Sequence, residues 1–445
     1  MDQFISQLLQ KAKAAGIEPA EVYYVSGESF RAMCQQGMIN NYTVNASRGL
    51  SLRGIYGGKM GYASTQAFDE DASSQLISGV IESAELTEDE SVQEIYAGDG
   101  NYPVIETFAP ELESVTAEEK LDYIRRAEEA LLKCDKRVVA TTYNMISTSS
   151  SCVRLVNSLG LDLTARDNFI FTYLSALAKD GDKTASGAKL IAGRRFDAEN
   201  AELSAKKASE EALFMLNAEP VQSGSYRAIF DPYAMSDMLS VFSAIFSAEN
   251  TQQNMSLLGG REGEKVASDV VSIIDDPLLP GGFDSRAFDD EGVASRTKSV
   301  VECGVLKTLL HNLKTARKAG VESTGNARRG GYSAPVRVAP SNFFIKPGEK
   351  TLEELMDGMG DGIVITSVSG LHAGANFMSG DFSLIAEGYL VKDGRKAQAV
   401  DRITVAGNFY DLLKSIRAVG CDLTFPDSSI GSPSVDVGEI QISGK

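Results

Sequence analysis

The predicted helices and strands of this chain are grouped in blocks and do not alternate one by one along the sequence. The strand blocks contain hairpin signals, such as the Gly57-Gly58 turn between two apolar runs, which join neighbouring strands antiparallel. A doubly wound parallel sheet would instead need a helical crossover between successive strands. The block order therefore favours an α+β fold with antiparallel or mixed sheets.

Apolar periodicity and capping residues place the individual elements. Thr116-x-x-Glu119 and Thr351-x-x-Glu354 are capping boxes, and each predicts the start of a helix. The predicted helices are 2–15, 69–86, 117–134, 198–216, 234–248 and a short one after Thr351; the predicted strands are 21–26, 30–34, 52–56, 60–63, 138–146, 152–157, 161–165, 169–178, 226–230, 300–303, 305–310, 362–368, 382–391 and 397–405.

The length of 445 residues exceeds that of one ordinary domain. Hydrophobic side chains make up 43% of the chain, which is enough for proper cores and argues against extensive disorder. Residues 219–225 separate the last predicted helix of the first half from the next strand. We therefore expect an N-terminal α+β domain at residues 1–222 and a C-terminal α+β domain at residues 223–445.

The formal net charge of −18 limits the partners of the protein. An acidic surface repels phosphate backbones and anionic lipid, so direct binding of nucleic acid or membrane is disfavoured. Arg328-Arg329 is a candidate for a local basic patch, whereas Asp289-Asp290-Glu291 is expected in a solvated loop rather than at a cation site. The N-terminus lacks signal-peptide character and no window reaches about 18 uninterrupted apolar residues, so we expect a cytoplasmic protein.

The five cysteines are scattered along the chain, and no Cys-x-x-Cys pair occurs. This spacing argues against a disulfide framework and against a zinc ribbon. We expect buried free thiols in a reducing compartment.

Histidine is the usual ligand of zinc and a frequent catalytic base, and this chain has two, His311 and His372. They lie too far apart in sequence to form the one-turn pair of a helical zinc site. His311 ends a predicted hairpin strand, where a structural role is expected. His372 lies in a Gly-rich stretch with Asn376 and Asp381 nearby, which predicts either a pocket lining or a hydrogen-bonded turn.

Other common site motifs are missing. The chain has no Gly-x-Ser-x-Gly elbow and no Gly-x-x-x-x-Gly-Lys-Ser/Thr loop. Gly358-x-Gly360-x-Gly362 precedes a predicted strand instead of following one, so it lacks the context of a dinucleotide fingerprint. From the residues alone, the chain is an α+β protein with a glycine-lined segment, and these residues do not identify its function.

A set of short motifs follows in fixed order along nearly the whole chain. They are Arg48-Gly49-Leu50-Ser51-Leu52-Arg53, Gly61-Tyr62-Ala63-Ser64-Thr65, Asn157-Ser158-Leu159-Gly160, Asp289-Asp290-Glu291-Gly292-Val293, Arg296-Thr297, Gly304-Val305-Leu306-Lys307, Thr315-Ala316-Arg317-Lys318, Thr324-Gly325-Asn326-Ala327-Arg328-Arg329, Gly380-Asp381-Phe382-Ser383, Ala386-Glu387-Gly388 and Thr404-Val405-Ala406-Gly407-Asn408. The ordered set resembles the bacterial and archaeal TldD/PmbA family.

This resemblance implies a TldD/PmbA-type fold and a division between two kinds of member. TldD-type members resemble zinc metallopeptidases, with His-Glu-x-x-x-His on the helix after the domain boundary and a cysteine near the C-terminus. The corresponding helix here, Met235–Ala248, has no histidine, and its only acid before the apolar stretch is Asp237. Cys421 lies near the family cysteine and, without partners, is expected to be structural. The chain is therefore similar to TldE-type members, also called PmbA, with a degenerate metallopeptidase-type C-terminal domain.

The resemblance implies a non-catalytic subunit that pairs with a TldD-type subunit and handles unfolded or modified peptides in degradation or maturation. Neither catalytic nor metal-binding residues are assigned to this chain, and no cofactor is expected, since zinc would belong to the partner. The older family label, modulator of DNA gyrase, implies no DNA ligand. The candidate peptide-contacting residues are His372, Asn376, Asp381, Asn326 and Arg328.

Two alternatives remain open. In one, the chain is a peptide-binding or regulatory homodimer without a peptidase role. In the other, it is an independent metal-free hydrolase that uses His372, with Asp381 and a nearby Ser or Cys. Capture of a peptide by strand addition is compatible with either binding hypothesis.

Overall fold

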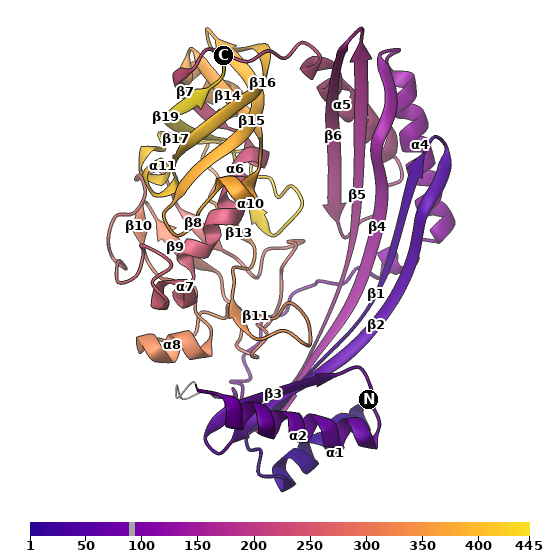
Figure 1. Cartoon of the computed structure of the whole chain (residues 1–445), viewed down its shortest axis with the longest axis vertical. Helices are drawn as coiled ribbons and strands as arrows, with labels where there is room; N and C mark the ends of the chain where they lie inside the picture. The colour runs from indigo at the N-terminus through magenta and orange to yellow at the C-terminus, as the bar shows by residue number, and fades with distance from the viewer. Residues whose placement is uncertain (89–93) are drawn as a thin grey trace.

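The computed structural model describes residues 1–88 and 94–445 and confirms the predicted α+β class (Figure 1). The first half is built on an antiparallel sheet with the strand order β3-β2-β1-β4-β5-β6. Its long strands curve past the side of the second half (Figure 1). The strands are β1 (Ala20–Gln35), β2 (Met38–Tyr56), β3 (Lys59–Thr65), β4 (Val138–Asn157), β5 (Asp162–Asp180) and β6 (Lys183–Gly193).

Four strands of this sheet are much longer than the sequence pattern predicted, and β2 begins at Met38 instead of at residue 52. The segments predicted at 138–146 and 152–157 form the single strand β4. In the same way, the predicted strands 21–26 and 30–34 merge into β1, and 161–165 and 169–178 merge into β5. The Ser-rich stretch between the two predicted parts of β4 breaks the apolar alternation, but its backbone still pairs with β1 and β5. Ladder hydrogen bonds need only backbone groups, so a polar stretch continues a strand that has neighbours on both sides. Strand β6 was not predicted.

Helices cover the two ends of this sheet (Figure 1). At one end, Leu8 of α1 and Leu76 of α2 pack with Leu50 and Leu52 of β2. At the other end, α4 and α5 bury Ile124 and small alanines against β4 and β5. The capping box at Thr116 begins α4 as predicted. The helices are α1 (Asp2–Ala14), α2 (Glu70–Leu86), α3 (Pro110–Glu113), α4 (Ala117–Cys134) and α5 (Asn200–Met215).

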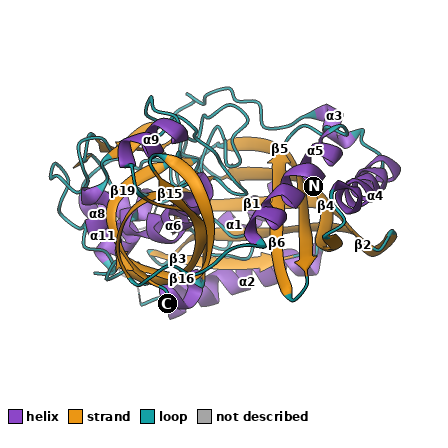
Figure 2. Cartoon of the chain, turned by 90° about the horizontal axis from the view of Figure 1, so that it is seen from above, coloured by secondary structure: helices purple, strands orange, loops and turns teal. Residues whose placement is uncertain are grey.

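The second half contains a closed ring of strands. β19 pairs with β7 on one side and with β16 on the other, so the order β16-β15-β14-β7-β19 returns to its start (Figure 2). The pairing of β14 with β7 is parallel, which makes this a mixed sheet. The ring strands are β7 (Gly224–Phe230), β14 (Gly362–Ser369), β15 (Asp381–Lys392), β16 (Arg395–Asn408) and β19 (Val435–Ser443), with β17 (Ala418–Val419) on β19.

Helix α6 (Pro232–Phe242) packs into the core of this half. Its apolar face buries Met235, Met238, Leu239 and Phe242, and Figure 2 shows the helix within the outline of the ring. The predicted helix at 234–248 is shorter than expected and breaks after Phe242. Serine side chains there bond to the local backbone, and such bonds compete with helical hydrogen bonds. The chain continues as a 3-10 turn, η1 (Ser243–Phe246), and a short α7 (Ala248–Gln252).

Short elements complete the second half. A small mixed sheet has the order β10-β9-β8-β13-β18, and β11 pairs with β12. The capping box at Thr351 begins α9 as predicted. In the described part of the chain, no helix is both long and apolar enough to cross a membrane. The elements are β8 (Ile273–Asp275), β9 (Lys298–Glu302), β10 (Val305–Leu306), α8 (Leu313–Ala319), β11 (Ala327–Arg328), β12 (Arg337–Val338), β13 (Phe343–Ile345), α9 (Leu352–Met359), α10 (Leu371–Gly374), α11 (Phe409–Ser415) and β18 (Ile430–Gly431).

Candidate functional site

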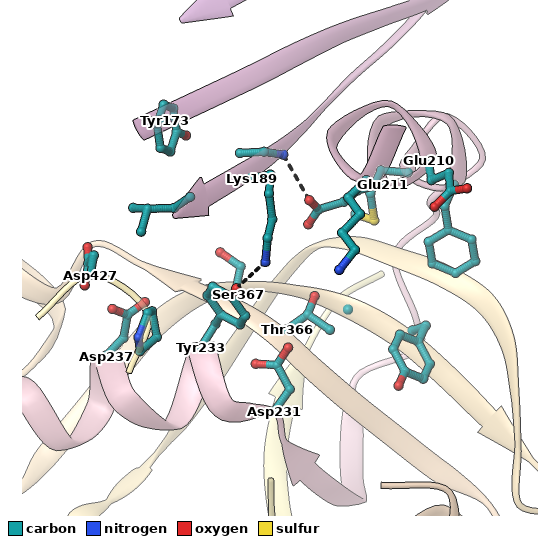
Figure 3. A pocket seen from close by; sticks show the side chains of 18 of the residues that line it. Tyr173, Lys189, Glu210, Glu211, Asp231, Tyr233, Asp237, Thr366, Ser367 and Asp427 are labelled. Atoms are coloured by element: carbon teal, nitrogen blue, oxygen red, sulfur yellow. Dashed lines mark hydrogen bonds between the residues drawn. The ribbon is translucent and has the colours of Figure 1, made fainter. Parts of the chain in front are cut away.

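A cavity of about 750 Å³ lies between the two halves. One wall comes from β5, β6 and α5 of the first half, and the other from α6, β14, β15, β16 and a C-terminal loop. A cavity of this size is in the range of small-molecule and peptide sites. Figure 3 labels the lining residues Tyr173, Lys189, Glu210, Glu211, Asp231, Tyr233, Asp237, Thr366, Ser367 and Asp427.

Helix α6 presents its solvent-facing stripe to this cavity. Asp231 caps the helix by accepting a hydrogen bond from the Ala234 backbone N–H at 2.9 Å, and Pro232 follows at the first helical position. Tyr233 and Asp237 lie one turn apart and both line the cavity. The opposite face is apolar and buried, so the outward positions of the helix are the polar residues Tyr233, Asp237 and Ser240.

The donor groups on α6 do not fit a zinc site. Asp237 is the one metal-ligating side chain between Pro232 and Phe242, and zinc needs at least three protein ligands of the His, Cys or carboxylate type. Within residues 1–88 and 94–445, no three His, Cys, Asp or Glu side chains are arranged to hold a metal ion. Cys421 is exposed, and its backbone N–H donates to the Lys350 carbonyl at 2.7 Å. The residues present therefore give α6 no zinc chemistry.

The carboxyl group that caps α6 and the one on its outward stripe both have raised pKa values. Burial raises the pKa of Asp231 to about 7, although its helix-capping hydrogen bonds favour the ionised form. Burial, assisted by the negative charge of Asp427, raises the pKa of Asp237 to about 6. Burial also raises the pKa of Glu211, whose carboxylate accepts a hydrogen bond from the Ala188 backbone at 2.9 Å. The charges of Lys189 and Lys396 oppose the shift of the Glu211 pKa, whereas no cationic group of the described residues opposes that of Asp237.

The amino groups of the cavity are held mainly by aromatic rings and a hydroxyl group. Lys189 donates to the Tyr233 hydroxyl at 3.1 Å (Figure 3). The Lys396 nitrogen lies 3.8 Å from the ring centre of Phe214 and 4.4 Å from that of Tyr389. Burial lowers the pKa of Lys396, and the charge of Glu211 opposes this shift. Positive and negative side chains thus both line the cavity, and no two of the described lining residues form an ion pair with each other.

The residues proposed from the sequence as peptide contacts lie outside this cavity. His372 is exposed on α10, and no hydrogen bond joins its imidazole to another described residue. The Asn376 backbone N–H donates to the Asp381 carbonyl at 2.9 Å, and Asn408 donates to the Asp381 carboxylate at 2.8 Å. Asn376 and Asp381 therefore build the turn that leads into β15.

Asn326 and Arg328 belong to a separate polar network. Asn326 is 2% exposed and donates to Asp275 at 2.8 Å, while Lys298 donates to Asn326 at 3.1 Å. Arg328 is partly buried and forms an ion pair with Asp284 at 2.8 Å. No hydrogen bond or ion pair between described residues joins this network to the turn that holds His372 and Asp381.

An ionic cluster fastens the two halves to each other. Glu21 of β1 accepts hydrogen bonds from Arg53 of β2 and from Arg329 of the second half, both at 2.7 Å. Arg53 also lies 3.2 Å from Glu291, and Tyr23 donates to Asp290 at 3.1 Å. We call Glu21, Arg53, Glu291 and Arg329 the bridging cluster. Several of the family-like motifs therefore supply contacts between the halves.

These contacts correct two expectations from the sequence. The acidic run from Asp289 to Glu291 is not a solvated loop, because its three residues are 0%, 8% and 4% exposed. Burial raises the pKa of Asp289 to about 7, while backbone N–H groups, including that of Ala327, bind its carboxylate. Arg329 is 8% exposed and does not form a surface basic patch. Burial of these charges is tolerated because oppositely charged side chains from distant segments form ion pairs within the cluster.

The expectation of buried thiols is also wrong for most of the cysteines. Cys34 is buried against Glu128, and Cys152 is half-buried. Cys134, Cys303 and Cys421 are exposed, because each lies at a helix end or in a turn rather than on a core face. His311 is buried as expected for a packed position, and its backbone N–H donates to Thr324 at 2.6 Å.

The sequence offered a weak signal for the cavity itself. Asp237 was visible as the one acid before the apolar stretch of the predicted helix. Lys189, Glu211 and Asp427 carried no motif, because the cavity joins side chains from separate segments. Only the packing of α5 and β6 against α6 identifies them as neighbours.

Three family models match consecutive parts of the chain. They are described as PmbA/TldA metallopeptidase domain 1 over residues 20–91, the central domain over 110–216 and the C-terminal domain over 223–444. Together they span nearly the whole sequence.

Relatives and solved structures agree with these matches. A metalloprotease of Methanocaldococcus jannaschii is 28% identical over 94% of both chains. The metalloprotease PmbA of Escherichia coli O157:H7 is 24% identical, covering 100% of this chain and 96% of that protein. A Thermotoga maritima crystal structure, described as a candidate modulator of a DNA gyrase, has a TM-score of 0.91 and 35% identity, covering 99% of this chain and all of the other.

A further structure, TldE of Thermococcus kodakarensis, has a TM-score of 0.90 and covers 99% of this chain and 100% of that one. At 22% identity this likeness shows the shared fold. The family models, the full-length relatives and the Thermotoga structure together settle the relationship. The chain belongs to the PmbA/TldD metallopeptidase family.

Proposed function

We propose that this chain is the non-catalytic, TldE-type subunit of a TldD/TldE-like heterodimeric zinc metallopeptidase that degrades or matures peptides in the cytosol. The observation that carries the proposal is the outward stripe of α6, where Tyr233 and Asp237 face the cavity and no histidine is present. A helix with this donor set cannot hold zinc or an activated water.

The cavity beside α6 supports a role in holding peptide. Both halves of the chain form its walls, and they line it with aromatic, acidic and basic side chains. In this proposal the chain contributes one wall of a peptide chamber, and the TldD-type partner supplies the zinc and the hydrolytic step. The likeness to a TldE structure supports such a pairing.

Co-expression tests the proposal. The chain is purified alone and together with a histidine-bearing TldD-type subunit from the same genome, and each sample is measured for bound zinc and for cleavage of an unfolded peptide. We expect no stoichiometric zinc and no cleavage by the chain alone, and higher activity of the pair than of the partner alone. Chelator-sensitive cleavage by the isolated chain would overturn the assignment.

The same samples separate the alternatives. A homodimer that binds peptide and never associates with a TldD-type subunit would favour the regulatory role. Metal-independent cleavage that is lost in His372→Ala would favour the hydrolase. The structure gives the His372 imidazole no orienting carboxylate among the described residues, so we expect His372→Ala to leave the activity of the pair unchanged.

A further inference from the structure

One end of the 750 Å³ cavity carries two carboxylates that lack a cationic partner. Asp237 projects from α6, and Asp427 lies above it on the C-terminal loop (Figure 3). Among the described residues, no Lys or Arg nitrogen forms an ion pair with either group, and the charge that acts on Asp237 is the like charge of Asp427. Two neighbouring carboxylates without a counter-ion favour the binding of a cation.

The lysines of the cavity do not neutralise this pair. Lys189 is directed to the Tyr233 hydroxyl, and Lys396 lies over two aromatic rings. The third lysine of the lining, Lys207, is exposed on α5 and does not act on the carboxyl group of Asp237. The cavity therefore has an acidic end around Asp237 and a separate region with amino groups. A ligand with a positive charge at one end and hydrogen-bond acceptors further along matches both regions.

The acidic end suits an organic ammonium group better than a metal ion. A hard divalent cation takes six or more oxygen ligands, and no three acidic, His or Cys side chains are arranged to hold a metal in the described part of the chain. A primary ammonium has three N–H donors and needs only a few acceptors. The carboxylate oxygens of Asp237 and Asp427 offer that number.

We propose that the cavity binds peptides through a primary ammonium group held between Asp237 and Asp427, with Lys189 and Tyr233 directed to the peptide carbonyl oxygens. The ammonium group is supplied by the amino terminus of the peptide or by a lysine side chain. The inference rests on the proposed function for its biological role, but the binding itself is a property of this chain alone. It assigns peptide recognition to the face of α6 that has no zinc ligands.

Calorimetric titration of the isolated chain tests the inference with three probes of one sequence length. They are Ala-Leu-Phe-Ala amide with a free amino terminus, its N-acetylated form, and N-acetyl-Ala-Lys-Phe-Ala amide. Binding of the first or third probe, with at least tenfold weaker binding of the second, supports the proposal and identifies the source of the ammonium. Equal binding of all three, or no binding of any at millimolar concentration, overturns it.

Variants locate the site. Asp237→Asn and Asp427→Asn keep the side-chain shape, and each is expected to weaken binding of the ammonium probe several-fold, with about tenfold for the double variant, as for other hydrogen bonds to charged groups. The matched control Asp71→Asn changes an exposed acid on α2, at the far end of the first-half sheet, and should bind like the unmodified chain. Unchanged affinity in the double variant contradicts the inference.

The two proposals fail in different experiments. If Asp237→Asn impairs folding, as judged by thermal unfolding, Asp427→Asn on the exposed loop still tests the site. Peptide binding that persists without any gain of activity in the TldD pair contradicts the proposed subunit role alone. Normal complementation by a chain that does not bind the ammonium probes contradicts this inference alone.

Discussion

Replacing Glu21 by Gln should strongly destabilise the contact between the two halves. Glu21 is fully buried and accepts hydrogen bonds from Arg53 and from Arg329, both at 2.7 Å. In the Glu21→Gln variant, Arg53 retains Glu291 at 3.2 Å, whereas Arg329 loses its only carboxylate ion-pair partner among the described residues. The guanidinium of Arg329 is then left buried with its positive charge unpaired.

The magnitude follows from this geometry. Removing one partner of a buried ion pair costs about 3–5 kcal/mol, because the remaining charge stays away from water. The Tyr23 ring lies 4.3 Å from the Arg329 guanidinium carbon, and a cation–π contact offsets about 1–2 kcal/mol of this cost. We therefore expect Glu21→Gln to lower the free energy of unfolding by about 3 kcal/mol.

Urea unfolding measures the effect. Because the chain has no tryptophan, circular dichroism and tyrosine fluorescence report the transition. Glu18→Gln is the control, since the Lys13–Glu18 pair has the same kind of contact at 2.9 Å but side chains that are 66% and 51% exposed. It should cost less than about 1 kcal/mol.

A double variant completes the cycle. Glu21→Gln with Arg329→Met removes both the acceptor and the stranded charge, so it should be more stable than Glu21→Gln alone. A cost below about 1 kcal/mol for Glu21→Gln, or strictly additive effects in the cycle, would refute the view that the bridging cluster holds the halves together through paired buried charge.

Three further substitutions test other parts of the structure. Asp231→Asn keeps the helix cap but removes a carboxyl group whose folded pKa of about 7 lies above its unfolded value. Such a group contributes stability that is present at low pH and lost as the pH rises through 7, and the variant should lack this contribution. The free energy of unfolding from urea titrations should therefore fall less between pH 5.5 and pH 8 than in the parent, by of order 1–3 kcal/mol, and an unchanged fall contradicts the assignment. Phe242→Ala empties a fully buried core position and should cost about 3–5 kcal/mol in urea unfolding, whereas a cost near 1 kcal/mol would place α6 outside the core. Gly388→Ala would put a Cβ 1.9 Å from the Val364 carbonyl oxygen and should lower the free energy of unfolding by about 3 kcal/mol. In Gly358→Ala, the added Cβ on helix α9 meets nothing within 4 Å, so this variant should be neutral or more stable by up to about 1 kcal/mol. Equal melting temperatures for the two variants would contradict the close strand packing at Gly388.

Local chemistry explains which parts of the fold were predictable from the sequence. Helices α4 and α9 begin at the predicted capping boxes, because the Thr116–Glu119 and Thr351–Glu354 hydrogen bonds join residues three positions apart. The family resemblance could also be recognised from the sequence, because it depends on short motifs in a fixed order. The absence of histidine from α6 is likewise a property of the sequence, and it carries the proposed function.

Long strands and buried charges were decided by tertiary structure. The Ser-rich centre of β4 carries no strand pattern of its own, yet it pairs on both sides. Asp289 and Arg329 look like surface residues in sequence, but their partners come from other segments. The hydrogen bond from Arg329 to Glu21 joins residues 308 positions apart.

The sequence by itself therefore determined the fold class, the family and the missing zinc ligands, because these depend on local periodicity, short motifs and residue identity. The tertiary structure alone decided where the charged residues act. It placed the acidic run and Arg329 at the contact between the halves and gathered Lys189, Asp237 and Asp427 around one cavity. The physical reason is that the free energy of a charge depends on burial and on its nearest opposite charge, and both are set by segments remote in the chain.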